Sequence, residues 1–226
     1  MYNYKIKFTK KPEAPELSDD DIFELVDAYF SALLNNGQVI GGYDVFSSGG
    51  FVYATFVMPT EDALSGIYDN EYVKKYLAEL NAVFDMEFIR EGENLEYEEP
   101  CECAKPSWFF LQTEHFTNSS PLNCGECDCR IPLYKVPHIL GEKEHFSVKC
   151  WQSSHKNLHQ LWIEGLWDKF AYREISTHNS KLARKGRKIC KEFEKALGVP
   201  VYYYLYYFNG IECDDFVPRG KNMQGI

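Results

Sequence analysis

The first 95 residues combine two hydrophobic patterns, one typical of strands and one typical of helices. Residues 2–8 place apolar side chains at every second position, which predicts a strand with one solvent-facing side. Residues 38–46 and 51–58 are two further strand-like runs, joined by a Ser-Ser-Gly-Gly sequence that suits a hairpin. Residues 83–89 predict a last strand.

Two helices are predicted between these strands. The first follows Ser18, a good capping residue, and three aspartates then fill its first turn, where the helix dipole favours negative charge. It ends at Gly37, and the second helix covers residues 71–80 with Asp69 or Asn70 as its cap. The order strand-helix-strand-strand-helix-strand predicts an α+β protein with a ferredoxin-like N-terminal domain, a topology that hosts many functions.

The C-terminal part of the chain predicts two helices and a final strand. Residues 180–197 form the clearer helix, with Asn179 or Ser180 as its cap, and the tyrosine-rich residues 201–208 form the strand. A helix is also expected over residues 148–167. Its apolar positions are Trp151, Leu158, Leu161, Trp162 and Leu166.

Five of the eight cysteines lie between residues 101 and 129. Cys101 and Cys103 form one close pair, and Cys124 and Cys127 form a second pair after a 20-residue loop. Two pairs that each supply two sulfurs from one turn suit a tetrahedral thiolate site, so these four residues predict a structural Zn²⁺ ion with no open position for catalysis. Cys129 is a fifth candidate that can replace Cys127. Reduced cysteines without metal and a redox disulfide are the alternatives.

A charged stretch over residues 91–100 separates the ferredoxin-like pattern from the cysteine cluster. We therefore expect an acidic ferredoxin-like domain over residues 1–95. A zinc ribbon is expected over residues 96–136, and a region with helices and a final strand over residues 137–226.

Composition and charge narrow the class of protein. The chain has 226 residues, of which 45% are hydrophobic and 16% aromatic, so it can bury a core. No run approaches the roughly 18 apolar residues of a membrane span, and no secretory signal is evident, which favours a cytoplasmic protein with metal-binding cysteines. The net charge is −10, which argues against a generic nucleic-acid coat. Residues 1–100 carry 7 Lys/Arg against 20 Asp/Glu, whereas residues 101–226 carry 17 against 14.

Several motifs occur together in the second half of the chain. They are Ser120-Pro121-Leu122-Asn123-Cys124-Gly125-x-Cys127, Ile131-Pro132-Leu133-Tyr134, Ser180-x-Leu182-Ala183-x-x-Gly186-Arg187-x-x-Cys190 and Gly198-Val199-Pro200-Val201-Tyr202-Tyr203-Tyr204-Leu205. With them the chain resembles, over roughly residues 100–210, a bacterial zinc-ribbon-containing family of unknown function whose label suggests nucleic-acid binding. That family carries a second Cys-x-x-Cys near its C-terminus, where this chain has only Cys213. The resemblance therefore leaves open whether Cys213 replaces one of the four ligands.

Residues 180–197 also offer a candidate nucleic-acid surface. A basic helix face followed by tyrosines can track phosphates and stack on bases, although a solvated helix face over an apolar stripe has the same pattern. The seven basic positions are Lys181, Arg184, Lys185, Arg187, Lys188, Lys191 and Lys195.

The sequence offers weaker evidence for a catalytic motif than for the cysteine site. His155 and His159 have a metal-compatible spacing on a helix but lack the Glu of a His-Glu-x-x-His motif, so we expect ordinary, partly exposed histidines. Neither a zinc-deaminase pattern nor a glycine-rich phosphate loop is present. An enzyme that uses a cysteine or histidine remains the least favoured alternative.

These observations favour a non-catalytic protein-binding module, stabilised by zinc. An acidic, aromatic-rich N-terminal domain suits an immunity or inhibitor-type protein that neutralises a basic bacterial toxin or effector, because complementary charge speeds association. The alternative is a zinc-ribbon protein that binds RNA or DNA. The oligomeric state does not follow from the sequence.

Overall fold

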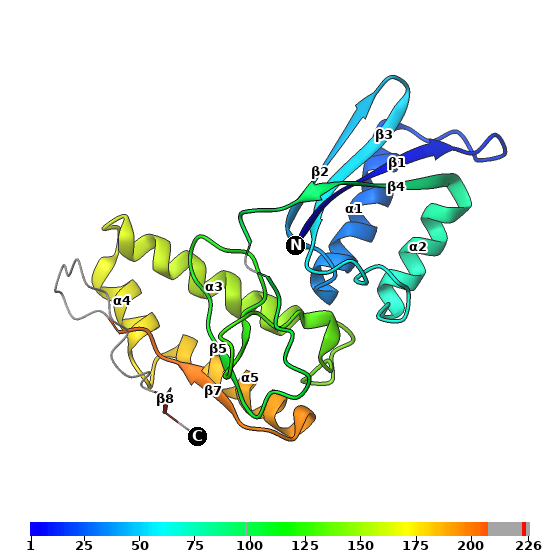
Figure 1. Ribbon diagram of the computed structural model, residues 1–226. Coiled ribbons are helices and arrows are strands. Elements are labelled where there is room, and N and C mark those ends of the chain that lie inside the picture. The colour runs from blue at the N-terminus through cyan, green and yellow to red at the C-terminus, as the bar shows by residue number, and fades with distance from the viewer. Residues whose placement is uncertain (98, 208–222, 225–226) are drawn as a thin grey trace. The chain divides into compact units, whose positions relative to one another are not determined.

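The computed structural model describes residues 1–97, 99–207 and 223–224, and the chain forms two compact units (Figure 1). Unit 1 comprises Met1–Pro100, Asn118–Ser120 and Pro132–Phe146, and unit 2 comprises Cys101–Thr117, Pro121–Ile131 and Ser147–Ile226. The fold class is α+β, as predicted.

Unit 1 contains a four-stranded antiparallel sheet with the strand order β2-β3-β1-β4. Helices α1 and α2 lie on one side of this sheet (Figure 1). The order of elements and of strands confirms the ferredoxin-like prediction. The elements are β1 (Tyr2–Lys10), α1 (Asp19–Asn36), β2 (Ile40–Ser48), β3 (Phe51–Met58), α2 (Glu71–Val83) and β4 (Phe84–Glu93).

Local sequence signals fix both ends of α1. The Ser18 hydroxyl accepts a hydrogen bond from the Asp21 backbone N–H (3.2 Å), and the Asp21 carboxylate accepts one from the Ser18 backbone N–H (3.0 Å), which is a capping box. Gly37 ends the helix with φ +83°, and a Cβ there would lie 2.6 Å from Cβ of Leu133. Of the two residues predicted to cap α2, Asn70 does so, by accepting from the Val73 N–H at 2.9 Å.

The core of unit 1 lies between the sheet and its helices. Ile6, Phe8, Phe30 and Leu33 are fully buried there together with Ala54. The alternation along β1 therefore places its apolar side chains on the helix-covered face, as the sequence predicts.

A distant segment, Pro132–Phe146, completes unit 1. It begins with the short 3-10 helix η1 (Leu133–Lys135), and the Tyr134 hydroxyl donates to the Asp62 carboxylate at 3.0 Å. Farther along, the Lys143 amine donates to Glu71 at 2.6 Å. This segment lies in sequence between parts of unit 2, and the sequence pattern does not indicate its return to unit 1.

Unit 2 contains a second, smaller sheet with the strand order β6-β5-β7-β8. The parallel pairing of β5 with β7 joins the cysteine-bearing segment to the C-terminal region in one sheet. The strand predicted over residues 201–208 ends earlier, and Phe208 lies outside the described residues. The strands are β5 (Phe109–Leu111), β6 (Leu122–Cys124), β7 (Val201–Tyr204) and β8 (Met223–Gln224).

Three helices belong to the second half of the chain: α3 (Phe146–Ile163), α4 (Asp168–Ser176) and α5 (Lys181–Leu197). The prediction of one helix over residues 148–167 is wrong at its C-terminal end, because Gly165 and Trp167 adopt positive φ angles and Leu166 is 57% exposed. For α5 the predicted Ser180 cap is confirmed. No helix in the described part of the chain is long and apolar enough to cross a membrane.

Candidate metal site

Four cysteine sulfurs come together in unit 2. The Sγ atoms of Cys101, Cys103, Cys124 and Cys127 all lie within 4.8 Å of one another. In a tetrahedral thiolate site with Zn–S bonds of about 2.3 Å the sulfurs are about 3.8 Å apart, so the group is close to this spacing. The cluster can therefore hold a metal ion.

The second cysteine pair sits on a tight turn at the end of β6. Asp128 N–H donates to the Cys124 carbonyl (3.0 Å), and Cys124 N–H donates to the Cys129 carbonyl (2.9 Å). Glu126 N–H donates to the Cys124 sulfur at 3.4 Å, and Cys103 N–H donates to the Cys101 sulfur at 3.3 Å. Backbone donors of this kind stabilise negative charge on sulfur.

Gly125 is needed in this turn because the chain packs against an indole ring. Its N–H donates to the Trp108 carbonyl at 3.0 Å, and a Cβ at Gly125 would lie 2.0 Å from the Trp108 ring. The first pair is held beside the turn by the Cys101 N–H, which donates to the Arg130 carbonyl at 2.8 Å. Arg130 in turn donates to the Asn123 side chain at 2.5 Å. The two pairs are thus positioned by backbone contacts.

The thiols of Cys101, Cys103 and Cys127 do not ionise alike. Burial raises the pKa of Cys101, and hydrogen bonding to Cys127 raises the pKa of Cys103 to about 11. At Cys127 burial opposes ionisation, but the Cys129 backbone and the neighbouring thiols outweigh it and lower the pKa to about 7. A cation bound by all four sulfurs would displace the protons of the thiols that are still protonated, so its affinity would depend on pH.

The remaining cysteines lie elsewhere. Cys129 is outside the group of four, and its thiol donates to the Cys127 carbonyl at 3.5 Å. Cys190 is fully buried on α5, where burial raises the pKa of its thiol, and Cys150 is half-buried on α3. Cys213 lies outside the described residues.

The basic positions predicted on α5 lie along the outer side of that helix. Lys181, Arg184, Lys185, Lys188 and Lys191 are exposed, and among the described residues no ion pair involves them. Two other basic residues are engaged: Arg187 donates to the His178 carbonyl at 2.5 Å, and Lys195 pairs with Glu192 at 2.7 Å.

The expectation that His155 and His159 are partly exposed is wrong. Their side chains are only 4% and 9% exposed on α3. The signal was present in the sequence, because both positions fall on the apolar stripe that includes Trp151 and Leu158.

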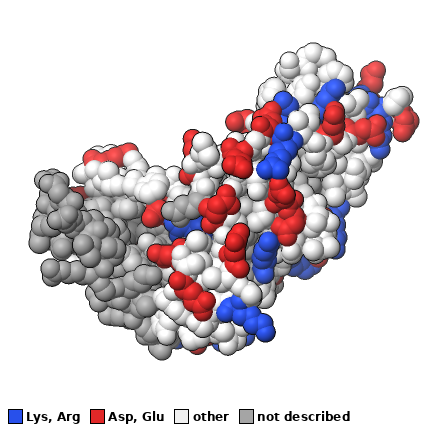
Figure 2. Space-filling model, viewed as in Figure 1, with Lys and Arg blue, Asp and Glu red and all other residues white. Residues whose placement is uncertain are grey.

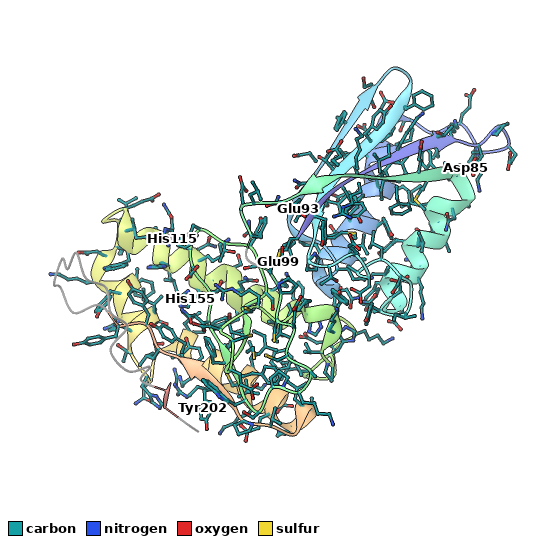
Figure 3. All side chains as sticks on the ribbon, in the orientation of Figure 1. Asp85, Glu93, Glu99, His115, His155 and Tyr202 are labelled. Atoms are coloured by element: carbon teal, nitrogen blue, oxygen red, sulfur yellow. The ribbon has the colours of Figure 1, made fainter. Side chains whose placement is uncertain are left out.

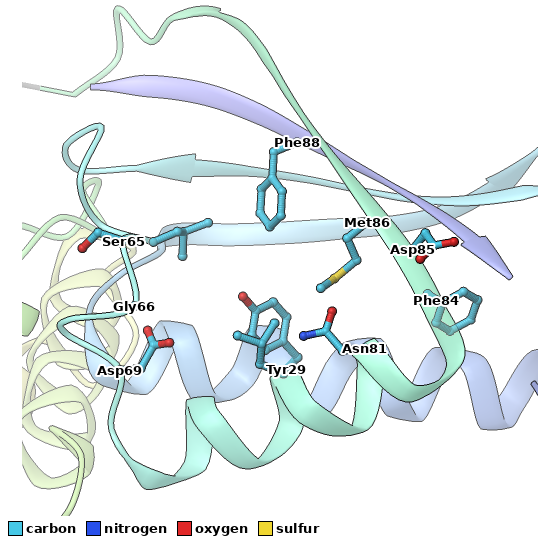
Figure 4. Close-up of a pocket in the computed structure, with 11 residues that line it drawn as sticks. Tyr29, Ser65, Gly66, Asp69, Asn81, Phe84, Asp85, Met86 and Phe88 are labelled. Atoms are coloured by element: carbon cyan, nitrogen blue, oxygen red, sulfur yellow. The ribbon is translucent and has the colours of Figure 1, made fainter. Parts of the chain in front are cut away.

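Unit 1 contains a cavity of about 500 Å³ between α1, α2 and β4 (Figure 4). Tyr29 and Asn81 face it from the helices and Phe88 from the strand. Burial, with a contribution from nearby Asp69, raises the pKa of Tyr29, so its hydroxyl keeps its proton. The Asp69 carboxylate accepts a hydrogen bond from Gln38 at 2.8 Å, and we assign this cavity no chemistry.

The chain matches known sequences in two parts. Residues 103–206 match a domain of unknown function (DUF2310), and residues 1–87 match a second domain of unknown function (DUF8589). An uncharacterized protein of Haemophilus influenzae is 33% identical over 199 residues, which are 82% of this chain and 74% of the relative. The chain belongs to the same family as this Haemophilus protein. The match over residues 103–206 agrees with the predicted resemblance to a family of unknown function.

A second uncharacterized protein of Haemophilus influenzae is 35% identical over 122 residues, which are 53% of this chain and 59% of that relative. Two solved structures are similar to part of the chain. An antibiotic biosynthesis monooxygenase is 18% identical with a TM-score of 0.33, covering 42% of this chain and 99% of that one. A Mycobacterium tuberculosis protein is 15% identical with a TM-score of 0.31, covering 41% and 96%. At these TM-scores neither structure informs the activity of the family.

Proposed function

We propose that the protein is a non-catalytic protein-binding module whose unit 2 is stabilised by a structural Zn²⁺ ion. Four cysteine ligands favour zinc among the common metals, and they leave no open position for chemistry. A thiolate site of this kind requires reduced cysteines, so the proposal places the protein in the cytoplasm. This is the zinc-ribbon role that the sequence predicts for Cys101, Cys103, Cys124 and Cys127.

We propose further that unit 1 binds a basic partner in the manner of an immunity or inhibitor protein that neutralises a bacterial toxin or effector. The observation that carries this proposal is an acidic ridge at the start of α1, formed by Asp19, Asp20 and Glu24 of the helix and by Glu16 just before it, with Phe23 among them. All four acids are exposed, and Phe23 is 52% exposed. Asp20 and Glu24 are one turn apart on the side of the helix that faces away from its buried residues.

The acidic ridge has the composition of a binding site for a positive surface. Asp21 is excluded from it, because its carboxylate is engaged by Ser18 in the capping box. Complementary charges accelerate encounter, and an exposed aromatic ring at the centre can supply an anchor. Acidic and basic side chains are mixed on the face in Figure 2, so the net charge alone does not mark a binding site.

The test is an affinity purification of the full chain from its host, with and without nuclease, followed by mass spectrometry. The proposal expects one stoichiometric protein that survives nuclease treatment and whose own activity falls when this chain is added. The variant Asp20→Lys/Glu24→Lys should reduce its recovery at least about tenfold, since interface charges typically matter most for association. The control Glu79→Lys/Glu87→Lys has the same net charge, and an equal loss there would contradict a role for the acidic ridge.

A second candidate function is nucleic-acid binding through α5. It is favoured by the five exposed basic side chains that form no ion pair within the described part of the chain. It expects binding to structured RNA or DNA that weakens steeply with salt. Lys185→Glu/Lys188→Glu should weaken such binding by at least about tenfold at low salt, whereas Lys74→Glu/Lys75→Glu on unit 1 should not. Nuclease-resistant recovery of a protein partner, with no salt-dependent nucleic-acid binding, would exclude this candidate.

A further inference from the structure

Three histidines of unit 2 form a cluster that neither the metal site nor the acidic ridge uses. His155 and His159 lie one turn apart on α3, and His115 lies on the loop between β5 and β6. Figure 3 labels His115 and His155. The ring centroids of His115 and His159 are 4.7 Å apart, and those of His155 and His159 are 6.2 Å apart. His159 therefore links the other two rings.

Each of these imidazoles has an unsatisfied nitrogen. The Nδ1 atoms of His115, His155 and His159 are buried, and within the described structure none of them has a hydrogen-bond partner. Leaving one buried polar atom unpaired typically costs about 1–3 kcal/mol. Three such nitrogens on neighbouring side chains therefore favour a ligand bound between them. Pure packing against aromatic rings does not need three nitrogen-bearing side chains.

Aromatic side chains enclose the cluster. Trp162 stacks on His159 with an interplanar angle of 11° and a centroid separation of 5.5 Å, and Tyr206 lies 4.9 Å from the same ring. Trp151 lies 5.5 Å from His155. Neutral imidazole is the form of histidine that binds transition metals.

We infer that His115, His155 and His159 form a second metal site, for a transition-metal ion that prefers imidazole ligands, such as Zn²⁺. Two imidazoles bound to one tetrahedral ion have centroids about 5 Å apart, given metal–nitrogen bonds of about 2.0–2.1 Å. The 4.7 Å pair fits this spacing, and the 6.2 Å pair must shorten by about 1 Å. Among the described residues only the cysteine group already meets the 4.8 Å spacing, so ring rotation accompanies binding here.

The second site differs in chemistry from the cysteine site. Three protein ligands leave at least one position for water or another small ligand, whereas four thiolates leave none. Imidazole ligands also accept copper and nickel, so the site selects a class of ions rather than zinc alone. This inference is independent of the partner proposed for unit 1.

The experiment is a Co²⁺ titration of the full chain after metal removal, followed by absorption spectroscopy. Cobalt bound to the cysteines gives an intense thiolate charge-transfer band in the near ultraviolet, and cobalt bound to imidazoles gives only visible bands. We expect two equivalents to bind, with the near-ultraviolet band complete after one. His159→Phe and His115→Phe keep the ring packing and remove a ligand, so both should lose the imidazole equivalent and keep the thiolate band.

The exposed His178 supplies a matched control, and His178→Ala should bind both equivalents. Saturation of the wild-type chain at the thiolate equivalent alone would overturn the inference without requiring any variant to fold. Retention of a second, non-thiolate equivalent by both His159→Phe and His115→Phe would overturn it as well. Absence of the near-ultraviolet band would instead refute the cysteine site and leave the histidine site to be judged by its visible bands.

Discussion

The two units of the molecule differ in the length of their strands and in the residues that they bury. In unit 1, β1, β3 and β4 are 8 to 10 residues long and cover a continuous apolar core. In unit 2, the strands are only 2 to 4 residues long, and its buried residues include Cys124, Cys190, His155 and His159 beside the apolar side chains. Short strands bury little area, so the sheet of unit 2 contributes less apolar burial than the sheet of unit 1. We therefore expect metal binding to supply the difference.

The sharpest test of this difference is removal of the metal. Chelation, or the variant Cys124→Ser, should unfold the cysteine region of unit 2, because metal binding contributes about 10 kcal/mol or more in small zinc domains. All four tryptophans lie in unit 2: Trp108, Trp151, Trp162 and Trp167. Tryptophan fluorescence therefore reports on unit 2 alone, and its emission should shift to the red.

Amide hydrogen exchange in β1, β3 and β4 supplies the internal control for that experiment. Protection of these strands should persist in the chelated protein, since no cysteine lies in residues 1–100. Unchanged zinc stoichiometry in Cys124→Ser would contradict the ligand assignment. Loss of protection in both units would contradict the proposed difference between them.

Acid should weaken unit 2 through its buried histidines. With no metal bound to the histidines, the pKa of His155 is about 4 in the folded chain and about 6.5 when unfolded, so the unfolded chain binds more protons between these values. The stabilisation is complete above pH 6.5 and is lost progressively as the pH falls to 4, by at most about 1.4 kcal/mol per pH unit. Urea unfolding monitored by tryptophan fluorescence at several pH values measures this slope.

A His155→Phe variant separates this effect from loss of metal at the cysteines. It removes the titrating group, so the slope between pH 6.5 and 4 should become shallower than in the wild-type chain. An equal slope in both proteins would show that the histidine does not contribute.

Packing between α5 and β7 should tolerate no added methyl group at Gly186. A Cβ there would lie 2.1 Å from the Tyr203 ring, which is itself buried. Gly186→Ala should therefore destabilise unit 2 by about 1–3 kcal/mol, although alanine is the better helix former. Lys188→Ala on the exposed side of the helix is the control, and a stabilised Gly186→Ala variant would contradict the close packing.

The smallest expected effect belongs to unit 1. Ser18→Ala removes the N-cap of α1 and should lower the free energy of unfolding of unit 1 by about 1 kcal/mol. Amide exchange in β1 and β3 measures this loss, and the tryptophan signal of unit 2 should not change. The exposed Ser65→Ala is a matched control that should leave exchange unaltered.

Most of unit 1 could be predicted from the sequence, because its signals are local. Alternating apolar residues in β1, the Ser18 cap and the Gly37 stop each depend on neighbours within a few positions. The spacing of the cysteines likewise predicted which four residues would meet, since each pair lies on one turn. The cap and stop of α5 were predictable for the same reason.

Long-range placement could not be predicted in this way. The return of Pro132–Phe146 to unit 1 and the parallel pairing of β5 with β7 join segments far apart in the chain, and neither leaves a local pattern. The apolar stripe of α3 indicated the burial of His155 and His159, but His115 and Tyr206, which pack against His159, come from distant parts of the chain. The sequence alone therefore determined the elements of unit 1, both ends of α5 and which four cysteines lie together, because these depend on neighbouring residues. Only the tertiary structure decided which elements share a core, because burial depends on contacts between distant parts of the chain.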